Sequence, residues 1–143
     1  MNIVDIGDVR RVAQDVFLGT RVFLAYVYGS RIRGNCRADS DLDIGYYLSE
    51  TQGFDGGPLS IHDEMVLADR LSRLIGIAVD LRNMQAAPLE LRGRVLEEGE
   101  RIFCSDERAR VALESDLLSR YHDYKPTFAA MHEIRLAALA KSA

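Results

Sequence analysis

The segment YGSRIRGNCRADSDLDIGYYL, residues 28–48, places a Gly-Ser pair ahead of two aspartates that are separated by one residue. Its first residue, Tyr28, ends the segment VFLAYVY (22–28), which runs apolar without a break and stops at Gly29. An uninterrupted run rich in Val, Phe and Tyr is typical of a buried strand. The sequence therefore predicts a buried strand that ends in a tight turn at Gly29-Ser30.

The segment SDLDIGYYL (40–48) has a different, alternating pattern. Leu42 and Ile44 alternate with Asp41 and Asp43. Because successive side chains of a strand point to opposite faces, the two aspartates share one face and the two apolar residues share the other. The pattern predicts a second strand with an acid-bearing face.

Helices and short strands are predicted around this pair. Apolar residues at three- and four-residue spacing predict helices over about 9–19 and 60–76. IAVDLRN (77–83) and ERIFC (100–104) predict two more strands, with a helix over 88–99 between them, and two helical segments follow. This order predicts an α/β (α+β) domain in which a small sheet is flanked by helices.

Composition limits the possible partners and compartments. The 143 residues fit one domain, 1–143, with C-terminal helices over about 105–141 that pack on it or contact a partner. The net charge is −4, with 18 basic against 22 acidic residues, so we expect no direct nucleic-acid binding. No apolar run is long enough to cross a membrane, and the first residues do not follow the order of a signal peptide. We therefore expect a cytoplasmic protein without a membrane partner.

The turn at Gly29-Ser30 is a candidate phosphate site. A strand that turns directly into a helix leaves backbone N–H groups and the positive end of the helix dipole facing outward. Gly29 permits close approach of the backbone, and Ser30 can donate a hydroxyl hydrogen bond to a phosphate oxygen. A Gly-Ser pair by itself is more often a plain turn with a helix cap, so this interpretation depends on the neighbouring residues.

Three aspartates form a candidate metal site. Asp41 and Asp43 on one strand face repel each other unless a cation or a proton neutralises them, and carboxylate oxygens are the ligands that Mg²⁺ prefers. Asp80 lies in IAVDL, a predicted buried strand where an unpaired carboxylate is costly. If that strand lies beside Asp41 and Asp43, three carboxylates converge near the Gly-Ser turn. The structural alternatives are an ordinary acidic strand edge, and a salt bridge from Asp80 to Arg82 or Arg94.

Taken together, these residues resemble the signature of the nucleotidyltransferase superfamily of the DNA polymerase beta type. That signature is Gly-Ser, ten or so residues, Asp-x-Asp, and a distant Asp, here Gly29-Ser30, Asp41, Asp43 and Asp80. Over nearly its whole length the chain is similar to the minimal nucleotidyltransferases (MNT), whose stretch GSRARG…SDxDL matches GSRIRGNCRADSDLDI. The resemblance implies the small mixed sheet of that fold.

The resemblance also implies a reaction and a partner. Asp41, Asp43 and Asp80 would hold two Mg²⁺ ions and act as the catalytic carboxylates, while Gly29, Ser30 and Arg31 would bind the phosphates of ATP. Many members of the family are encoded beside a HEPN-domain ribonuclease toxin and act as its antitoxin. The implied activity is that of a protein adenylyltransferase, which transfers AMP from ATP to a tyrosine of the toxin, a separate chain.

Two other functions remain open from the sequence. A binding-only antitoxin with a degenerate site is disfavoured because the motif is intact, and a small-molecule nucleotidyltransferase of the aminoglycoside-modifying kind is disfavoured by the chain length. The C-terminal segment carries a moderate apolar stripe that suits a partner contact, although packing on the domain's own sheet is the simpler expectation. The stripe consists of Phe128, Met131, Ile134 and Ala138.

Overall fold

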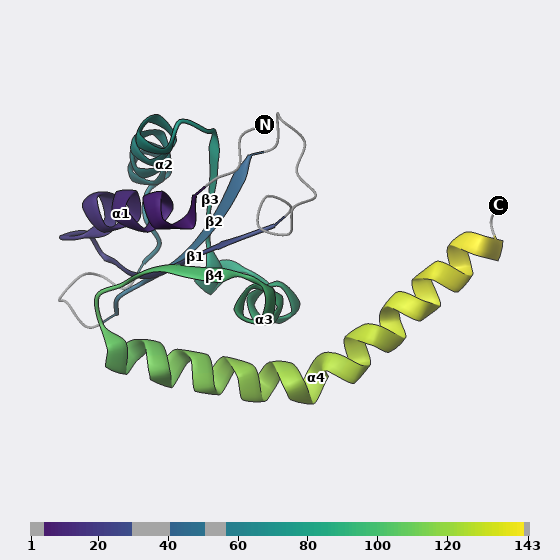
Figure 1. Cartoon of the computed structure of the whole chain (residues 1–143). Helices are drawn as coiled ribbons and strands as arrows, with labels where there is room; N and C mark the ends of the chain where they lie inside the picture. Colours follow the sequence, from purple (N-terminus) through teal and green to yellow (C-terminus); the bar gives the residue numbers. More distant parts are fainter. Residues whose placement is uncertain (1–4, 30–40, 51–56, 142–143) are drawn as a thin grey trace.

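The protein folds around a four-stranded mixed sheet. The computed structural model describes residues 5–29, 41–50 and 57–141 (Figure 1). The sheet has the order β3-β2-β1-β4, in which β1 pairs antiparallel with β2 and β4, and β2 pairs parallel with β3. The strands are β1 (Val22–Tyr28), β2 (Leu42–Leu48), β3 (Val79–Asn83) and β4 (Glu100–Cys104). This arrangement confirms the predicted fold class and each of the predicted strands.

Helices cover both faces of the sheet. Figure 1 shows α1 (Ile6–Phe17) and α2 (Ile61–Ile75) on one face, and α3 (Leu89–Glu98) with the first part of α4 (Glu107–Lys141) on the other. A short 3₁₀ turn, η1 (Met84–Ala86), connects β3 to α3. The start of α2 is the predicted one, since the Ser60 hydroxyl accepts a hydrogen bond from the Asp63 backbone N–H at 3.0 Å.

The apolar core forms two clusters, one against each face of the sheet. Strand β1 contributes to both, because it lies between β2 and β4 and is buried on both sides. This position explains its unbroken apolar sequence, whereas β2 buries Leu42 and Ile44 beneath α1 and α2 and leaves Asp43 on the other face, half-buried. Each buried Leu or Ile side chain contributes about 1.5–3 kcal/mol. The core therefore fixes the end of β1 and the start of β2 side by side, at the same end of the sheet.

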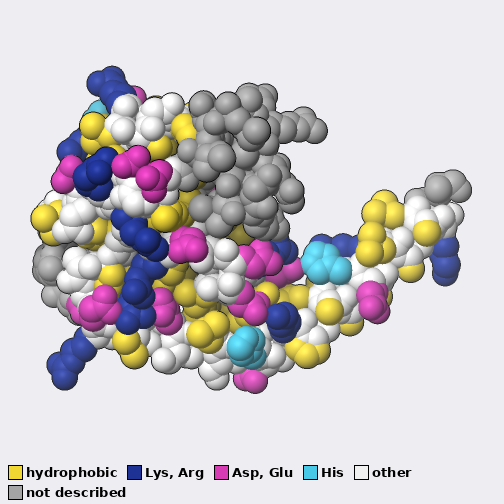
Figure 2. All heavy atoms as spheres, viewed as in Figure 1, with side chains coloured by type: hydrophobic (Ala, Val, Ile, Leu, Met, Phe, Trp, Pro, Cys, Tyr) yellow, Lys and Arg dark blue, Asp and Glu magenta, His cyan; other side chains and the backbone are white. Residues whose placement is uncertain are grey.

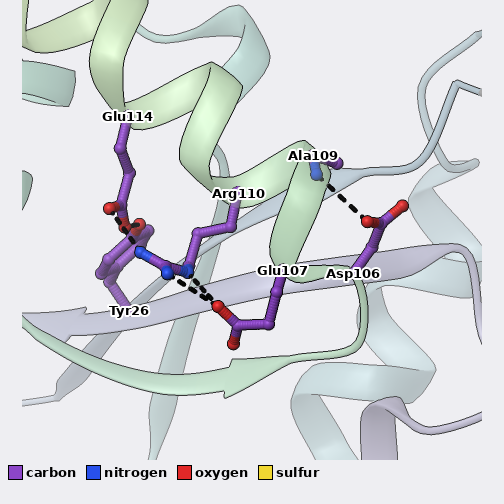
Figure 3. Close-up of polar contacts among 6 residues, drawn as sticks. All are labelled: Tyr26, Asp106, Glu107, Ala109, Arg110 and Glu114. Carbon is purple, nitrogen blue, oxygen red and sulfur yellow. Dashed lines mark hydrogen bonds and ion pairs between the residues drawn. The ribbon is translucent and has the colours of Figure 1, made fainter.

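The first turns of α4 are anchored to β1 by a polar cluster (Figure 3). Asp106 accepts a hydrogen bond from the Ala109 backbone N–H at 3.1 Å, as a helix cap does. The Tyr26 hydroxyl donates to Glu114, whose other carboxylate oxygen lies 2.9 Å from Nη1 of Arg110. Burial, followed by the hydrogen bond to Glu114, raises the pKa of Tyr26, so the phenol stays protonated and remains a donor.

The C-terminal part differs from the sequence prediction. The sequence predicts two helical segments here, whereas α4 is one helix of 35 residues with Pro126 inside it. A proline inside a helix removes one backbone hydrogen bond and favours a kink there, but it does not have to end the helix. Figure 1 shows that α4 bends in its middle.

The second half of α4 extends beyond the sheet. Leu117 and Tyr121 are buried, whereas Met131 is 46% exposed and Ile134 is 69% exposed. The apolar stripe of this segment is therefore not packed on the domain's own sheet, contrary to the simpler expectation. Figure 2 shows hydrophobic side chains on the surface of this extension. Within the described ranges, no helix, α4 included, is both long and apolar enough to cross a lipid bilayer.

Candidate active site

Gly29 forms the turn at the end of β1. Its φ angle is +91°, a left-handed conformation that glycine adopts without strain. A Cβ atom at this position would overlap Oδ2 of Asp43 and lie 3.3 Å from its Cγ. Glycine is therefore required here for two reasons: the backbone angle is left-handed, and the Asp43 carboxylate occupies the space that a side chain would need. Gly29 and the predicted acidic strand meet at this point.

The strand register brings Asp80 beside Asp43. Tyr28 of β1 lies opposite Asp43 of β2, and Asp43 lies opposite Asp80 of β3. Residues directly opposite each other on neighbouring strands point to the same face of a sheet. The three side chains therefore form one row across three strands, so the strand that carries Asp80 does lie beside Asp43, the condition on which the sequence analysis depended.

The pKa of Asp43 is raised above its ordinary value. Partial burial is the largest cause, and repulsion by Asp80 and then by Asp41 adds to it. The Arg82 guanidinium opposes the shift. The same row acts on the phenol of Tyr28, whose pKa is raised by burial first and then by Asp43. The site thus concentrates negative charge.

The surroundings of Asp80 differ from the prediction. The sequence predicts a buried strand, but β3 lies at the edge of the sheet and Asp80 is exposed. Only one face of β3 is buried: Leu81 belongs to the core there, and Ile77 and Val79 pack against it. This face explains the apolar residues around Asp80. Arg94, one of the two expected salt-bridge partners, pairs with Glu90 at 3.5 Å instead. A cation at this place would relieve the repulsion that Asp80 exerts on Asp43.

The remaining site residues of the sequence analysis divide into two groups. Asp41 is exposed and directly precedes β2, close enough to Asp43 to raise its pKa. Ser30 and Arg31 lie outside the described residues.

Among the residues that are described, no three His, Cys, Asp or Glu side chains converge closely enough to form a metal centre. The donors nevertheless fit a hard divalent cation, because they are carboxylates whose mutual repulsion such an ion would relieve.

A hollow of about 450 Å³ beside β3 was not predicted from the sequence. Asp80 and Arg82 line it, together with Glu64 of α2, two other residues of β3 and the residues that lead from β3 to α3. These further lining residues are Leu81 and Asn83 of β3, followed by Ala86, Ala87 and Pro88. Neither composition nor periodicity indicates such a hollow, because it depends on β3 being the edge strand.

Comparison with known proteins identifies solved structures of similar fold. A toxin–antitoxin structure with AMP-PNP is 20% identical, with a TM-score of 0.63, over 92% of this chain and 98% of that chain. A tri-AMPylated Shewanella oneidensis HEPN toxin in complex with MNT antitoxin gives a match at 18% identity and a TM-score of 0.59, over 91% of this chain and 95% of that chain. At these identities the likeness establishes the fold. No curated protein matches the chain significantly in sequence.

Family assignment comes from the sequence model described as "Polymerase beta, Nucleotidyltransferase". It matches residues 14–108, which include β1, β2, β3 and the row of Asp43 and Asp80. The match covers well over half of the chain and agrees with the mixed sheet and with the turn at Gly29. The chain therefore belongs to the polymerase beta nucleotidyltransferase family.

Proposed function

We propose that this chain is a protein adenylyltransferase antitoxin, which transfers AMP from ATP to a tyrosine of a HEPN ribonuclease toxin and so neutralises it. The observation that carries the proposal is the row of Asp43 and Asp80 beside the left-handed turn at Gly29. The row supplies clustered carboxylates, and the turn supplies a backbone that a phosphate can approach closely. Nucleotidyl transfer needs both features at one place.

ATP would bind between the turn and the carboxylates. Gly29, Ser30 and Arg31 would bind its phosphates, by backbone and hydroxyl donors and by one cationic side chain. Asp41, Asp43 and Asp80 would hold two Mg²⁺ ions, which relieve the repulsion that raises the pKa of Asp43. When bound, the ions supply neutralisation of the charge that develops on the phosphates.

The transfer step conserves atoms and charge in the following way. The tyrosine hydroxyl oxygen of the toxin attacks the α-phosphorus of ATP, and a new oxygen–phosphorus bond forms. The bond between the α-phosphorus and the oxygen that bridges to the β-phosphate breaks, and pyrophosphate leaves with the bonding electrons. The hydroxyl proton passes to Asp80, which lines the hollow beside β3, and from there to water. No oxidant or reductant is required.

The partner and the domain organisation follow the same proposal. The two solved structures compared above are both of toxin–antitoxin pairs, and one of them contains an AMPylated HEPN toxin. This supports a HEPN toxin as the acceptor of AMP. Residues 1–143 form a single nucleotidyltransferase domain, and the exposed half of α4 is available to the separate toxin chain. The reaction takes place in the cytoplasm, where ATP is the abundant donor.

The direct test uses ATP labelled at the α-phosphate. The chain, Mg²⁺, labelled ATP and a separately purified HEPN toxin are incubated, and label covalently attached to the toxin is measured. We expect the toxin to be labelled, and we expect Asp43→Asn and Asp80→Asn to reduce labelling at least a hundredfold. Asp116→Asn, at a surface aspartate of α4 paired with Arg120, serves as the matched control and should label normally. A toxin that stays unlabelled and regains ribonuclease activity on separation would support a binding-only antitoxin instead.

A further inference from the structure

Strand β3 has an open edge. In the described sheet β2 is its only strand neighbour, since the order is β3-β2-β1-β4. Among the described residues, the other side of β3 therefore keeps a row of backbone N–H and C=O groups without strand partners. An extended polypeptide can pair with such an edge by main-chain hydrogen bonds and place alternate side chains into neighbouring pockets.

The hollow beside β3 follows this edge. Four consecutive residues of the strand, 80–83, line it. Because neighbouring residues of a strand point to opposite faces, a cavity over only one face would be lined by alternate residues. The hollow therefore extends along the edge itself. It is bounded at one side by Glu64 of α2 and at the other by the residues between β3 and α3.

Polar side chains and apolar residues share the walls of the hollow, and the polar groups are held in place. The Glu64 carboxylate accepts a hydrogen bond from the Tyr46 hydroxyl at 2.6 Å, and the Asn83 side chain accepts one from the Gln85 backbone N–H at 2.9 Å. Arg82 adds a cation to this wall. Sites for drug-sized ligands are mostly apolar and enclosed, whereas this surface offers donors and acceptors along an open strand. Its chemistry suits a polar, extended chain.

Asp80 connects the hollow to the reaction, because it lines the hollow and also lies opposite Asp43. We infer that the open edge of β3 is the acceptor site, where an extended segment of the protein substrate lies along residues 79–83 and places its hydroxyl side chain at Asp80. This inference rests on the proposed function and specifies where the acceptor binds. Glu64, Arg82 and Asn83 then determine which segment is accepted.

The test fills the hollow without removing a contact. Ala86 lines the hollow and is exposed, so Ala86→Trp adds an indole ring there and leaves the core unchanged. Ala112→Trp is the matched control, because Ala112 is an exposed alanine of α4 that lines a different hollow. AMP transfer to a HEPN toxin is measured beside the slow conversion of ATP to AMP with water as acceptor. We expect Ala86→Trp to lower transfer to the toxin at least tenfold, with the water reaction unchanged, and Ala112→Trp to match the unmodified protein.

A second measurement does not depend on activity. Hydrogen exchange of the β3 amides is followed with and without the toxin, and we expect slower exchange over residues 79–83 when the toxin is present. Equal labelling of the toxin by Ala86→Trp and the unmodified protein, or unchanged exchange in β3, would overturn the acceptor site and leave the proposed function intact. An unmodified protein that labels no toxin would overturn the proposed function, and the acceptor site with it.

Discussion

At the residue scale, Gly29 and Asp43 are fitted to each other. The glycine has φ of +91°, and the Asp43 carboxylate occupies the space where a Cβ atom would lie. The absence of a side chain at position 29 thus has two separable consequences, one for the backbone and one for the carboxylate. Another glycine of the chain, Gly19, has only the first of them, with φ of +83° and, among the described residues, no atom within 4 Å of where its Cβ would lie.

Gly19 and Gly29 can be compared directly, because alanine at either position has the same backbone cost and only Gly29 contacts Asp43. Gly19→Ala should lower the free energy of unfolding by about 1–2 kcal/mol, the cost of a left-handed alanine, and leave nucleotidyl transfer intact. Gly29→Ala should have the same backbone cost and should also displace Asp43, so transfer is expected to fall at least a hundredfold. Urea unfolding and transfer of α-labelled AMP measure the two effects. Equal activity of the two variants would mean that the contact with Asp43 is not required.

Asp43 gives a prediction about pH. Its pKa in the folded chain lies above the value of 3.8 for an unperturbed aspartate, so protonation favours the folded state. The stability that this provides is complete below pH 3.8 and is lost as pH rises through the higher, folded pKa. Asp43→Asn should therefore equal the unmodified protein near pH 3 and be more stable at pH 7 without Mg²⁺. The difference should be about 0.2–1 kcal/mol, because the group is partly exposed to solvent.

Thermal unfolding at both pH values, with and without Mg²⁺, measures this difference. Added Mg²⁺ should raise the melting temperature of the unmodified protein more than that of Asp43→Asn, because the substitution removes a ligand and a repelling charge together. A variant that is markedly less stable at pH 7 without Mg²⁺ would indicate a structural role for the carboxylate.

The sequence predicts the chemistry of these residues better than their surroundings. The alternation of apolar and acidic residues around Asp43 is enough to predict which face carries the carboxylates, because strand geometry is local. The exposure of Asp80 could not be predicted, since an apolar run of a few residues does not distinguish an edge strand from a central one. The roles of Ser30 and Arg31 stay predictions.

At the element scale, α3 and α4 meet at Gly93. A Cβ atom on Gly93 would overlap the ring of Tyr121, 2.7 Å from its Cδ2. The contact holds the two helices close together where α4 leaves the sheet, and Lys125 continues it with an ion pair to Glu97 at 3.1 Å. Glycine costs about 1 kcal/mol inside an ordinary helix, so its presence in α3 is explained by this packing.

Gly93→Ala should therefore destabilise the protein, whereas replacing an ordinary helical glycine by alanine stabilises it. Overpacking against Tyr121 should lower the free energy of unfolding by about 1–3 kcal/mol, where helix propensity alone would raise it. Tyr121→Ala in the same chain should remove the clash, so a double-mutant cycle by urea unfolding should show a coupling between the two positions. Additive effects would contradict the packing described here.

The prediction of elements was most reliable where the pattern is local. Ser60 and Pro88 precede the helices as predicted, because a helix start depends on a few adjacent residues: a capping hydroxyl at Ser60, and the fixed backbone angle of proline at Pro88. The continuity of α4 through Pro126 could not be predicted, because a proline ends some helices and only bends others. The strand order and the parallel pairing of β2 with β3 depend on contacts distant in sequence, and the family resemblance implied only that the sheet is mixed.

At the scale of the whole molecule, the far part of α4 contributes little to the domain. His132 still contacts Glu90 of α3 at 2.7 Å, whereas Ile134, Leu136 and Leu139 beyond it are each at least 66% exposed. A chain that ends at residue 132 should therefore melt within about 2–4 °C of the full chain, the shift that about 1 kcal/mol produces in a domain of this size. A much larger fall in the melting temperature would show that this segment stabilises the core.

If the row of Asp43 and Asp80 makes the chain an enzyme, the chain should modify a HEPN toxin covalently. The measurement is the intact mass of the toxin after incubation with this chain, ATP and Mg²⁺, and again with Asp43→Asn in its place. The unmodified chain should leave the toxin heavier by one or more AMP units and inactive after separation, and Asp43→Asn should leave its mass unchanged. An unchanged toxin mass with the unmodified chain would contradict the claim.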